Sequence, residues 1–179
     1  MYFRKMIGKK CYLSPIDEND AERFTEWLND LDITEYLTLY PSIINVQSEK
    51  VLLEKLSKEH NYSVIDIKND ELIGNCGFLD IDHINQTAEA EIFIGDKNYW
   101  SKGYGTEALG LLLDYGFKAL NFHNIALRVY SFNARAIKCY KKLGFKPIGK
   151  RRKSILRNRE RYDIIYMDLL YDDYFNKIV

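Results

Sequence analysis

Apolar positions recur along the chain at two spacings, and each spacing predicts one kind of element. A spacing of three and four residues is typical of an amphipathic helix, and residues 17–31 carry such a stripe, formed by Phe24, Trp27, Leu28 and Leu31. Three further helices are predicted over residues 48–59, 103–120 and 133–143. In the helix over 48–59, Ser48 is available as the N-cap, and three apolar side chains are expected to face inward: Val51, Leu52 and Leu56. The helix over 103–120 is apolar nearly all round, so we expect it to be buried.

Short apolar runs between polar turns predict strands. The expected strands span residues 10–14, 62–67, 72–79, 88–94, 124–130, 146–156 and 162–170. Gly144 is placed to end the helix before the sixth strand, and Asn158 lies in the turn between the last two. No linker, repeat or low-complexity segment interrupts this order. We therefore expect a single α/β (α+β) domain over residues 1–179, with a mixed, mostly antiparallel sheet of about seven strands and about four helices.

Composition limits the kind of protein further. With 179 residues, 46% apolar and 29% charged, the chain suits one globular domain. No apolar run approaches the roughly 20 residues of a membrane-spanning helix, and the first residues lead into no apolar signal segment, so we expect a cytoplasmic protein without membrane partners. The three cysteines and three histidines are scattered, and we expect neither a disulfide framework nor a metal site.

Charge is balanced overall but unevenly distributed. Residues 17–35 hold eight carboxylates against Arg23 alone, and residues 138–161 hold eleven cations against Glu160 alone. Two solvated faces would explain this pattern, as would a molecule that attracts a cationic partner at one end and a polyanion at the other.

Two glycines one residue apart mark the sequence NYWSKGYGTEA at residues 98–108. They follow a predicted strand and open a predicted helix, whose first amides have no partner within the helix. Glycine lets an anion approach the backbone, so this turn could cradle a phosphate, or the pair could serve only the turn. It is not a P-loop, because no Gly-Lys-Ser/Thr ends it, and it lacks the third glycine of a dinucleotide fingerprint.

Several motifs together resemble the GNAT superfamily of acyl-CoA N-acyltransferases. They are the turn WSKGYG at 100–105, the segment NARAIKCYKKLGF at 133–145, and the ending Tyr162-Asp163 with Met167. The resemblance covers nearly the whole chain and is strongest to the branch of ribosomal-protein N-terminal and spermidine N-acetyltransferases. Trp100 stands where that family often has Gln or Arg, and because main-chain amides hold most of the phosphate, we expect cofactor binding to survive.

The resemblance implies that acetyl-CoA is the cosubstrate. Its diphosphate would lie on the turn, and its pantetheine arm would pair like a strand with the backbone at 93–95. Asn133 would bond the arm, although its position also suits a helix N-cap. The implied cofactor residues are Phe93, Ile94, Gly95, Trp100, Ser101, Lys102, Gly103, Tyr104, Gly105, Thr106, Asn133, Arg135, Lys138 and Lys142.

Acetylation of an amine needs a proton acceptor, an oxyanion donor and a proton for the departing thiolate. Glu89 and Glu91 alternate along one strand, so they share a face, and either could be the base or simply a solvated carboxylate. Tyr140 matches the family's general-acid tyrosine, because a phenol of pKa about 10 is protonated at neutral pH; without the resemblance it would be interpreted as a core residue. A backbone amide near Ile94 is the expected oxyanion donor.

The acceptor is less well defined. Asp32, Glu35 and Tyr36 occupy the region that lines the acceptor site in the family. Their charge suits a polyamine such as spermidine or the amino terminus of a basic protein, and a homodimer is possible. A non-catalytic acyl-CoA-binding module is the alternative. Nucleic acid is an unexpected partner, because the basic run at 150–153 lies on a strand without interleaved aromatics.

Overall fold

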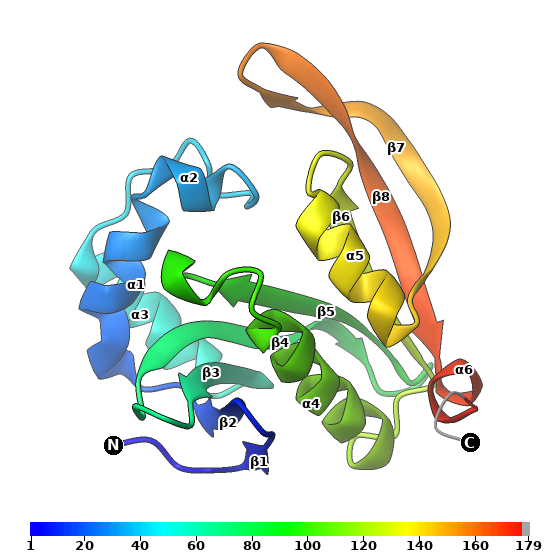
Figure 1. Cartoon of the computed structure of the whole chain (residues 1–179), viewed down its shortest axis with the longest axis horizontal. Helices are drawn as coiled ribbons and strands as arrows, with labels where there is room; N and C mark the ends of the chain where they lie inside the picture. Colours follow the sequence, from blue (N-terminus) through cyan, green and yellow to red (C-terminus); the bar gives the residue numbers. More distant parts are fainter. Residues whose placement is uncertain (177–179) are drawn as a thin grey trace. The chain divides into compact units, whose positions relative to one another are not determined.

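A computed structural model describes residues 1–176 of the chain. Within these residues eight strands form one mixed sheet in the order β1-β2-β3-β4-β5-β6-β8-β7 (Figure 1). The strands are β1 (Met6–Ile7), β2 (Cys11–Pro15), β3 (Asn61–Asp66), β4 (Leu72–Asp82), β5 (Thr87–Ile94), β6 (Asn124–Tyr130), β7 (Lys146–Arg157) and β8 (Glu160–Leu170). The helices are α1 (Ala21–Leu28), α2 (Leu31–Thr34), α3 (Val46–Leu56), α4 (Tyr104–Lys118), α5 (Ala134–Leu143) and α6 (Tyr171–Phe175), with short 3₁₀ turns η1 (Glu18–Asp20) and η2 (Lys97–Tyr99).

The predicted fold class is confirmed, and the additional elements are short. β1, α2 and α6 have two, four and five residues, too few to produce a periodic pattern. The sheet is mostly antiparallel as expected, and only β5 and β6 are recorded as parallel partners. In the described part of the chain, no helix combines the length and the apolar character needed to cross a membrane.

The chain folds into two compact units. The first holds residues 1–77 and 92–112, and the second holds residues 78–91 and 113 onward. Strands β4 and β5 contribute residues to both units.

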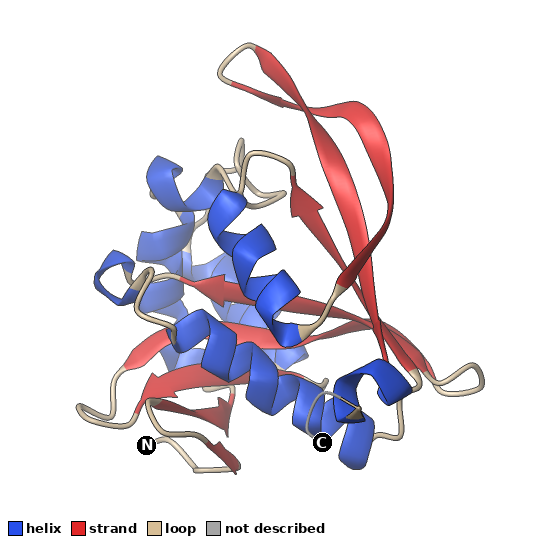
Figure 2. Ribbon diagram, turned by 45° about the vertical axis from the view of Figure 1, so that its right-hand side comes forward, coloured by secondary structure: helices blue, strands red, loops and turns tan. Residues whose placement is uncertain are grey.

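The core of the first unit lies between α1, α3 and the strands β2 and β3 (Figure 2). Tyr12 and Ile65 from the strands join Phe24 and Trp27 of α1 and Leu53 of α3 in one buried cluster. The predicted helix over 17–31 is divided, because Asp30 accepts a hydrogen bond from the amide of Asp32 and so caps a new helix. Leu31, expected on the buried stripe, is consequently 63% exposed.

The inward face of α3 was predicted wrongly. Asn45, rather than Ser48, caps the helix, since its side chain accepts a hydrogen bond from the Ser48 amide. Glu49 and Leu53 are the buried residues, with Leu56 partly buried, whereas Val51 and Leu52 are exposed. A carboxylate on the inner face hid this register from the apolar pattern, and burial raises the pKa of Glu49.

The helix over 103–120 was expected to be buried, and α4 is buried along one face. α4 buries the stripe that includes Leu109, Leu112 and Leu113, while Lys118 is exposed. In the second unit an added Cβ at Gly116 would lie 2.6 Å from Phe78 and 3.1 Å from Ile125, so the end of α4 packs closely on β4 and β6. The apolar residues outside the stripe are only partly covered.

The turns of the second unit follow the sequence. Gly144 ends α5 with φ +108°, and its amide donates to the carbonyl oxygens of Tyr140 and Lys141. Asn158 and Arg159 connect β7 to β8 with φ of 49° and 67°. Two successive left-handed residues between paired strands are typical of a type I′ hairpin turn.

We predict that Gly144→Ala destabilises the protein by about 1–3 kcal/mol, because a side chain is strained at this positive φ. Gly149→Ala is the matched control, since Gly149 has no positive φ and an added Cβ would meet nothing within 4 Å. Urea unfolding should show a lower midpoint for Gly144→Ala and little change for the control. Equal midpoints for the two variants would contradict the helix-ending role.

Candidate active site

The end of β5 is packed closely against its neighbours in the first unit. A Cβ on Gly74 of β4 would lie 2.0 Å from the carbonyl oxygen of Phe93, and a Cβ on Gly95 would lie 2.1 Å from the Trp27 ring. The Gly95 amide donates to the Ile73 carbonyl oxygen at 2.9 Å. These contacts fix the backbone at 93–95, the segment expected to pair with a pantetheine arm.

The glycine turn leads directly into α4. Ser101 and Gly103 have φ of 59° and 87°, and the helical hydrogen bonds begin where the Glu107 amide donates to the Gly103 carbonyl oxygen at 3.0 Å. The amides of residues 104–106 therefore belong to the first helical turn, at the end of the helix that carries partial positive charge.

The two glycines of the turn differ in what explains them. Gly103 is required by its left-handed backbone, but Gly105 has no positive φ. A Cβ on Gly105 would only make ordinary contacts, 3.6 Å from Ile94 and 3.9 Å from Ile92. The backbone conformation of the turn thus explains why residue 103 is glycine. Neither backbone conformation nor close packing explains why residue 105 is glycine. Glycine at this position leaves the backbone of the first helical turn open to close approach by an anion.

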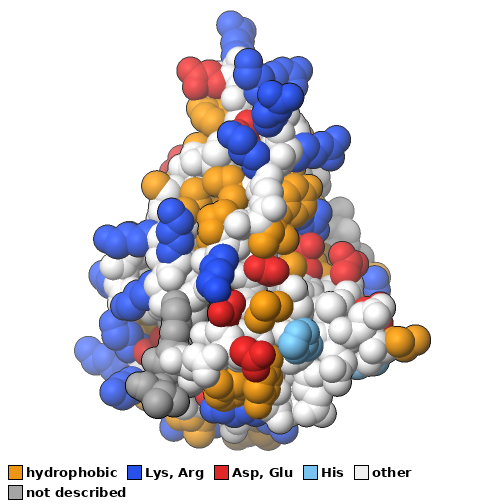
Figure 3. All heavy atoms as spheres, turned by 90° about the vertical axis from the view of Figure 1, so that its right-hand side faces the viewer, with side chains coloured by type: hydrophobic (Ala, Val, Ile, Leu, Met, Phe, Trp, Pro, Cys, Tyr) orange, Lys and Arg blue, Asp and Glu red, His pale blue; other side chains and the backbone are white. Residues whose placement is uncertain are grey.

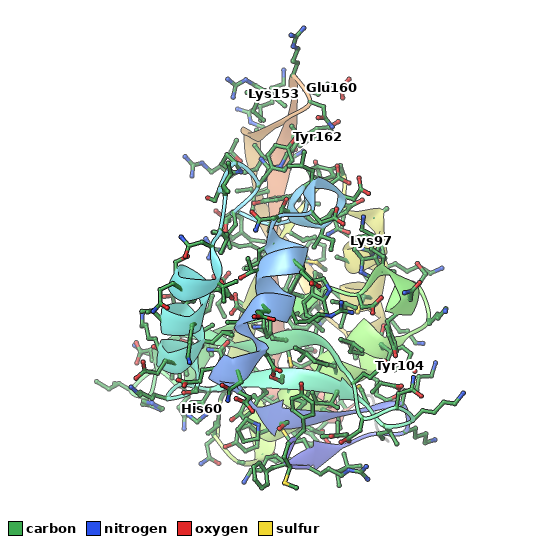
Figure 4. All side chains as sticks on the ribbon, turned by 90° about the vertical axis from the view of Figure 1, so that its left-hand side faces the viewer. His60, Lys97, Tyr104, Lys153, Glu160 and Tyr162 are labelled. Atoms are coloured by element: carbon green, nitrogen blue, oxygen red, sulfur yellow. The ribbon has the colours of Figure 1, made fainter. Side chains whose placement is uncertain are left out.

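Residues far away in the sequence hold the start of α4. The carboxylate of Glu107 accepts hydrogen bonds from the amides of Lys9 and Lys10, and Lys10 Nζ donates to the Lys102 carbonyl oxygen at 2.6 Å. The Tyr104 hydroxyl donates to Asp66 at 2.9 Å (Figure 4). Burial and this carboxylate raise the pKa of Tyr104 to about 12. Sequence reasoning missed Lys10 and Asp66, because only the fold brings them to the turn, and it missed the role of Glu107, because the amides that its carboxylate binds are distant in the sequence.

Trp100 connects the turn to β5. Its indole Nε1 donates to the carbonyl oxygen of Ile94 at 2.7 Å, and its ring packs edge-on against Tyr36 with centroids 6.3 Å apart. The tryptophan that departs from the family pattern therefore braces the turn against the strand and brings Tyr36 beside it.

The acidic segment near α2 has an internal counter-ion. Lys97 Nζ lies 2.7 Å from both Asp30 and Asp32 (Figure 4). Its hydrogen bond lowers the pKa of Asp30. Asp32, expected to face a cationic acceptor, is thus already paired, and Glu35 is partly buried. The spacing of apolar residues in the sequence did not predict that Lys97 pairs with these carboxylates.

The second unit carries the expected proton-transfer residues. Ala88 and Ala90 of β5 are buried, so Glu89 and Glu91 share the opposite face, as the alternation predicted. Glu89 accepts a hydrogen bond from Arg128 Nε of β6 at 2.6 Å, and this contact raises the pKa of the guanidinium.

The remaining expected residues lie along α5. The Asn133 side-chain oxygen accepts from the Ala136 amide at 3.1 Å, so the N-cap role is present, and the NH₂ group supplies the donors of that side chain. Tyr140 is buried at 9% exposure, and burial raises its pKa. Arg135, Lys138 and Lys142, the cations of this helix expected to meet nucleotide phosphate, are exposed.

Comparison with known proteins agrees with these features. The model of the acetyltransferase (GNAT) domain matches residues 10–146. An uncharacterized N-acetyltransferase, p20 of Bacillus licheniformis, is 31% identical over 179 residues, covering 94% of this chain and 97% of its own. The spermidine N(1)-acetyltransferase of Escherichia coli is 26% identical, covering 90% of this chain and 87% of its own.

A solved structure shows the same fold. The spermidine N-acetyltransferase of Vibrio cholerae, crystallised with CoA and spermine, superposes with a TM-score of 0.83 at 25% identity, covering 94% of this chain and all of its own. The domain match and the relative from Bacillus licheniformis both span most of the sequence. The chain is therefore a member of the GNAT family of acetyltransferases.

Proposed function

We propose that this enzyme transfers the acetyl group of acetyl-CoA to a primary amine of a polyamine. The observation that supports the proposal is Gly105, which has no positive φ and no close neighbour that excludes a side chain, so that glycine there leaves the backbone open to a bound group. A diphosphate fits that position, because the first amides of α4 and the helix dipole favour an anion there.

The cofactor residues divide between the two units. In the first, the amides of residues 102–106 would hold the diphosphate, with the Lys10 ammonium adding positive charge beside Lys102. The backbone at 93–95 would pair with the pantetheine arm. In the second, Asn133 would donate to that arm through its NH₂ group, and the exposed cations Arg135, Lys138 and Lys142 would meet nucleotide phosphate.

The reaction requires three groups. The amine becomes neutral when Glu91 or Glu89, directly or through water, accepts its proton, and it then attacks the thioester carbon. The Ile94 amide would stabilise the oxyanion. As the carbon–sulfur bond breaks, Tyr140 gives its proton to the thiolate, the acetylated nitrogen releases its remaining excess proton to solvent, and Tyr140 is reprotonated from solvent. Burial keeps the pKa of Tyr140 above its ordinary value, so the hydroxyl is protonated when needed.

A polyamine acceptor is supported by the relatives named as spermidine acetyltransferases. The alternative acceptor, a protein amino terminus, is favoured by one observation: Lys97 neutralises Asp30 and Asp32, which leaves fewer carboxylates for a polycation. Glu35 and Tyr36 would then contact either acceptor. A cytoplasmic location and a homodimer stay predictions.

An acceptor screen tests the proposal. With acetyl-CoA present, we expect free thiol to form faster with spermidine or spermine than with short peptides bearing a free amino terminus. Peptide turnover above polyamine turnover would transfer the assignment to protein amino termini. Absence of thiol release with every amine, despite acetyl-CoA binding, would identify the non-catalytic module instead.

Gly103→Glu should abolish the increase in melting temperature that acetyl-CoA produces, because a carboxylate at the turn repels the diphosphate. Gly103→Gln is the matched control: it imposes the same strain at φ +87° without charge. There is room for the side chain, as an added Cβ meets only Lys10 Nζ at 3.4 Å. We expect the glutamine variant to keep part of the shift. Equal shifts in both variants would argue against a phosphate at this turn.

Tyr140→Phe should lower kcat by about 10²–10⁴-fold, the usual contribution of a general acid, with little change in acetyl-CoA affinity. The buried ring and its contact with Phe145, with centroids 6.0 Å apart, are retained. Steady-state kinetics and calorimetric titration with acetyl-CoA measure the two effects separately. A kcat near that of the wild type would remove Tyr140 from the acid role.

A further inference from the structure

The hairpin formed by β7 and β8 extends beyond the rest of the second unit's sheet. β6 pairs with β8 only from Ile164 to Leu170, whereas β7 and β8 stay paired out to Arg157 and Glu160. β7 is the last strand in the sheet order. The outer part of the hairpin, residues 150–163, is therefore a two-stranded ribbon, which we call the hairpin tip (Figure 2).

The hairpin tip is strongly basic. It holds seven cations against Glu160 and Asp163: Lys150, Arg151, Arg152, Lys153, Arg157, Arg159 and Arg161. Lys150–Lys153, Arg159 and Arg161 are exposed, and Figure 3 shows Lys and Arg side chains gathered over the end of the hairpin. Five of the seven are arginines, whose planar guanidinium groups suit bidentate contacts with phosphate.

Both carboxylates of the tip have internal partners. Asp163 accepts from the Lys153 amide at 2.8 Å and lies 3.1 Å from Lys150 Nζ, contacts that lower its pKa. Glu160 accepts from the Tyr162 hydroxyl at 2.7 Å. Asp163 lies opposite an irregularity where β7 advances from Arg151 to Ile155 while β8 advances only from Ile164 to Tyr162. It therefore shapes the backbone that carries Arg152 and Lys153, and its ion pair is with Lys150.

An aromatic cluster supports the base of the tip. The rings of Tyr130 and Phe132 stack with centroids 5.6 Å apart, and Phe132 lies 4.7 Å from Tyr162. The Arg157 guanidinium lies 5.3 Å over the Tyr130 ring. The I′ turn at Asn158 and Arg159 closes the other end. The ribbon is thus organised before any partner binds, which reduces the entropic cost of association.

From this arrangement we propose that the hairpin tip binds the phosphate backbone of nucleic acid without sequence preference. A two-stranded ribbon is one of the shapes that enters a duplex groove, and clustered arginines supply the electrostatic part of such binding.

The sequence made nucleic acid an unexpected partner because the basic run lies on a strand without interleaved aromatics. In the structure, that strand is half of a projecting ribbon, and it packs near aromatic residues from residues 130–132 and from β8. Leu156 is the one large apolar side chain exposed in residues 150–163, which disfavours insertion into a membrane.

The experiment is a fluorescence anisotropy titration of a short labelled DNA duplex with the full chain at several salt concentrations. We expect a Kd of about 10⁻⁴–10⁻⁶ M, weakening as salt rises. The variant R151Q/R152Q/R159Q should reduce the slope of log K against log salt by about 3, one for each lost phosphate contact. The matched control K55Q/K58Q/K68Q removes three exposed cations from the first unit and should bind as the wild type does.

Circular dichroism and melting temperature verify that both triple variants are folded. Equal loss of binding in the two would overturn the proposal, because net charge alone would then explain it. Tighter binding to an acidic polypeptide, poly-aspartate, or to vesicles with phosphatidylserine than to the duplex would also overturn it, in favour of a protein or membrane surface. Acetyl transfer is not the readout, so this result is independent of the acceptor assignment.

Discussion

The first turn of α4 depends on being held from outside the helix. A helix start that binds an anion must leave its amides unpaired, which costs stability until the ligand arrives. Here the cost is offset by side chains that do not compete for those amides: Glu107 bonds the backbone at Lys9 and Lys10, and the Tyr104 hydroxyl bonds Asp66. The amides are kept in position by these contacts of the Glu107 and Tyr104 side chains. Cofactor affinity should therefore be sensitive to the hairpin of β1 and β2, although that hairpin lies almost a hundred residues earlier in the chain.

The segment before the glycine turn is held by α1 and α2 of the same unit. Trp27 packs against Gly95, Arg23 pairs with Asp96 at 3.1 Å, and Lys97 bridges Asp30 and Asp32. Exposed ion pairs of this kind each contribute little, but the aromatic contact is buried and allows no side chain at Gly95. Changes in α1 or α2 made to alter the acceptor should consequently disturb acetyl-CoA binding as well.

The sequence predicted the features that local chemistry determines. The strand 124–130 has the expected bounds, Gly144 ends its helix, and Asn158 lies in the hairpin turn. Features that depend on tertiary contacts were not predictable. The apolar pattern placed Val51 and Leu52 inside, because nothing in the sequence signals that Glu49 is buried. The same holds for Trp100: its contact with the Ile94 carbonyl requires the strand and the turn to be close in space. The site residues carried over from the family remain assignments by resemblance.

The acidic and the basic segment of the sequence differ in how far their charges are paired within the structure. Much of the acidic segment is paired within the first unit: Asp30 and Asp32 with Lys97, Glu26 with Arg23 and Glu18 with Lys50. In the basic segment, Lys146 pairs with Asp173, and the carboxylates of the hairpin tip are engaged with Lys150 and Tyr162. A charge run predicts a partner only when the fold supplies no counter-ions for it. On that criterion the acidic segment is mainly structural, and the hairpin tip is the surface from which an external polyanion gains most.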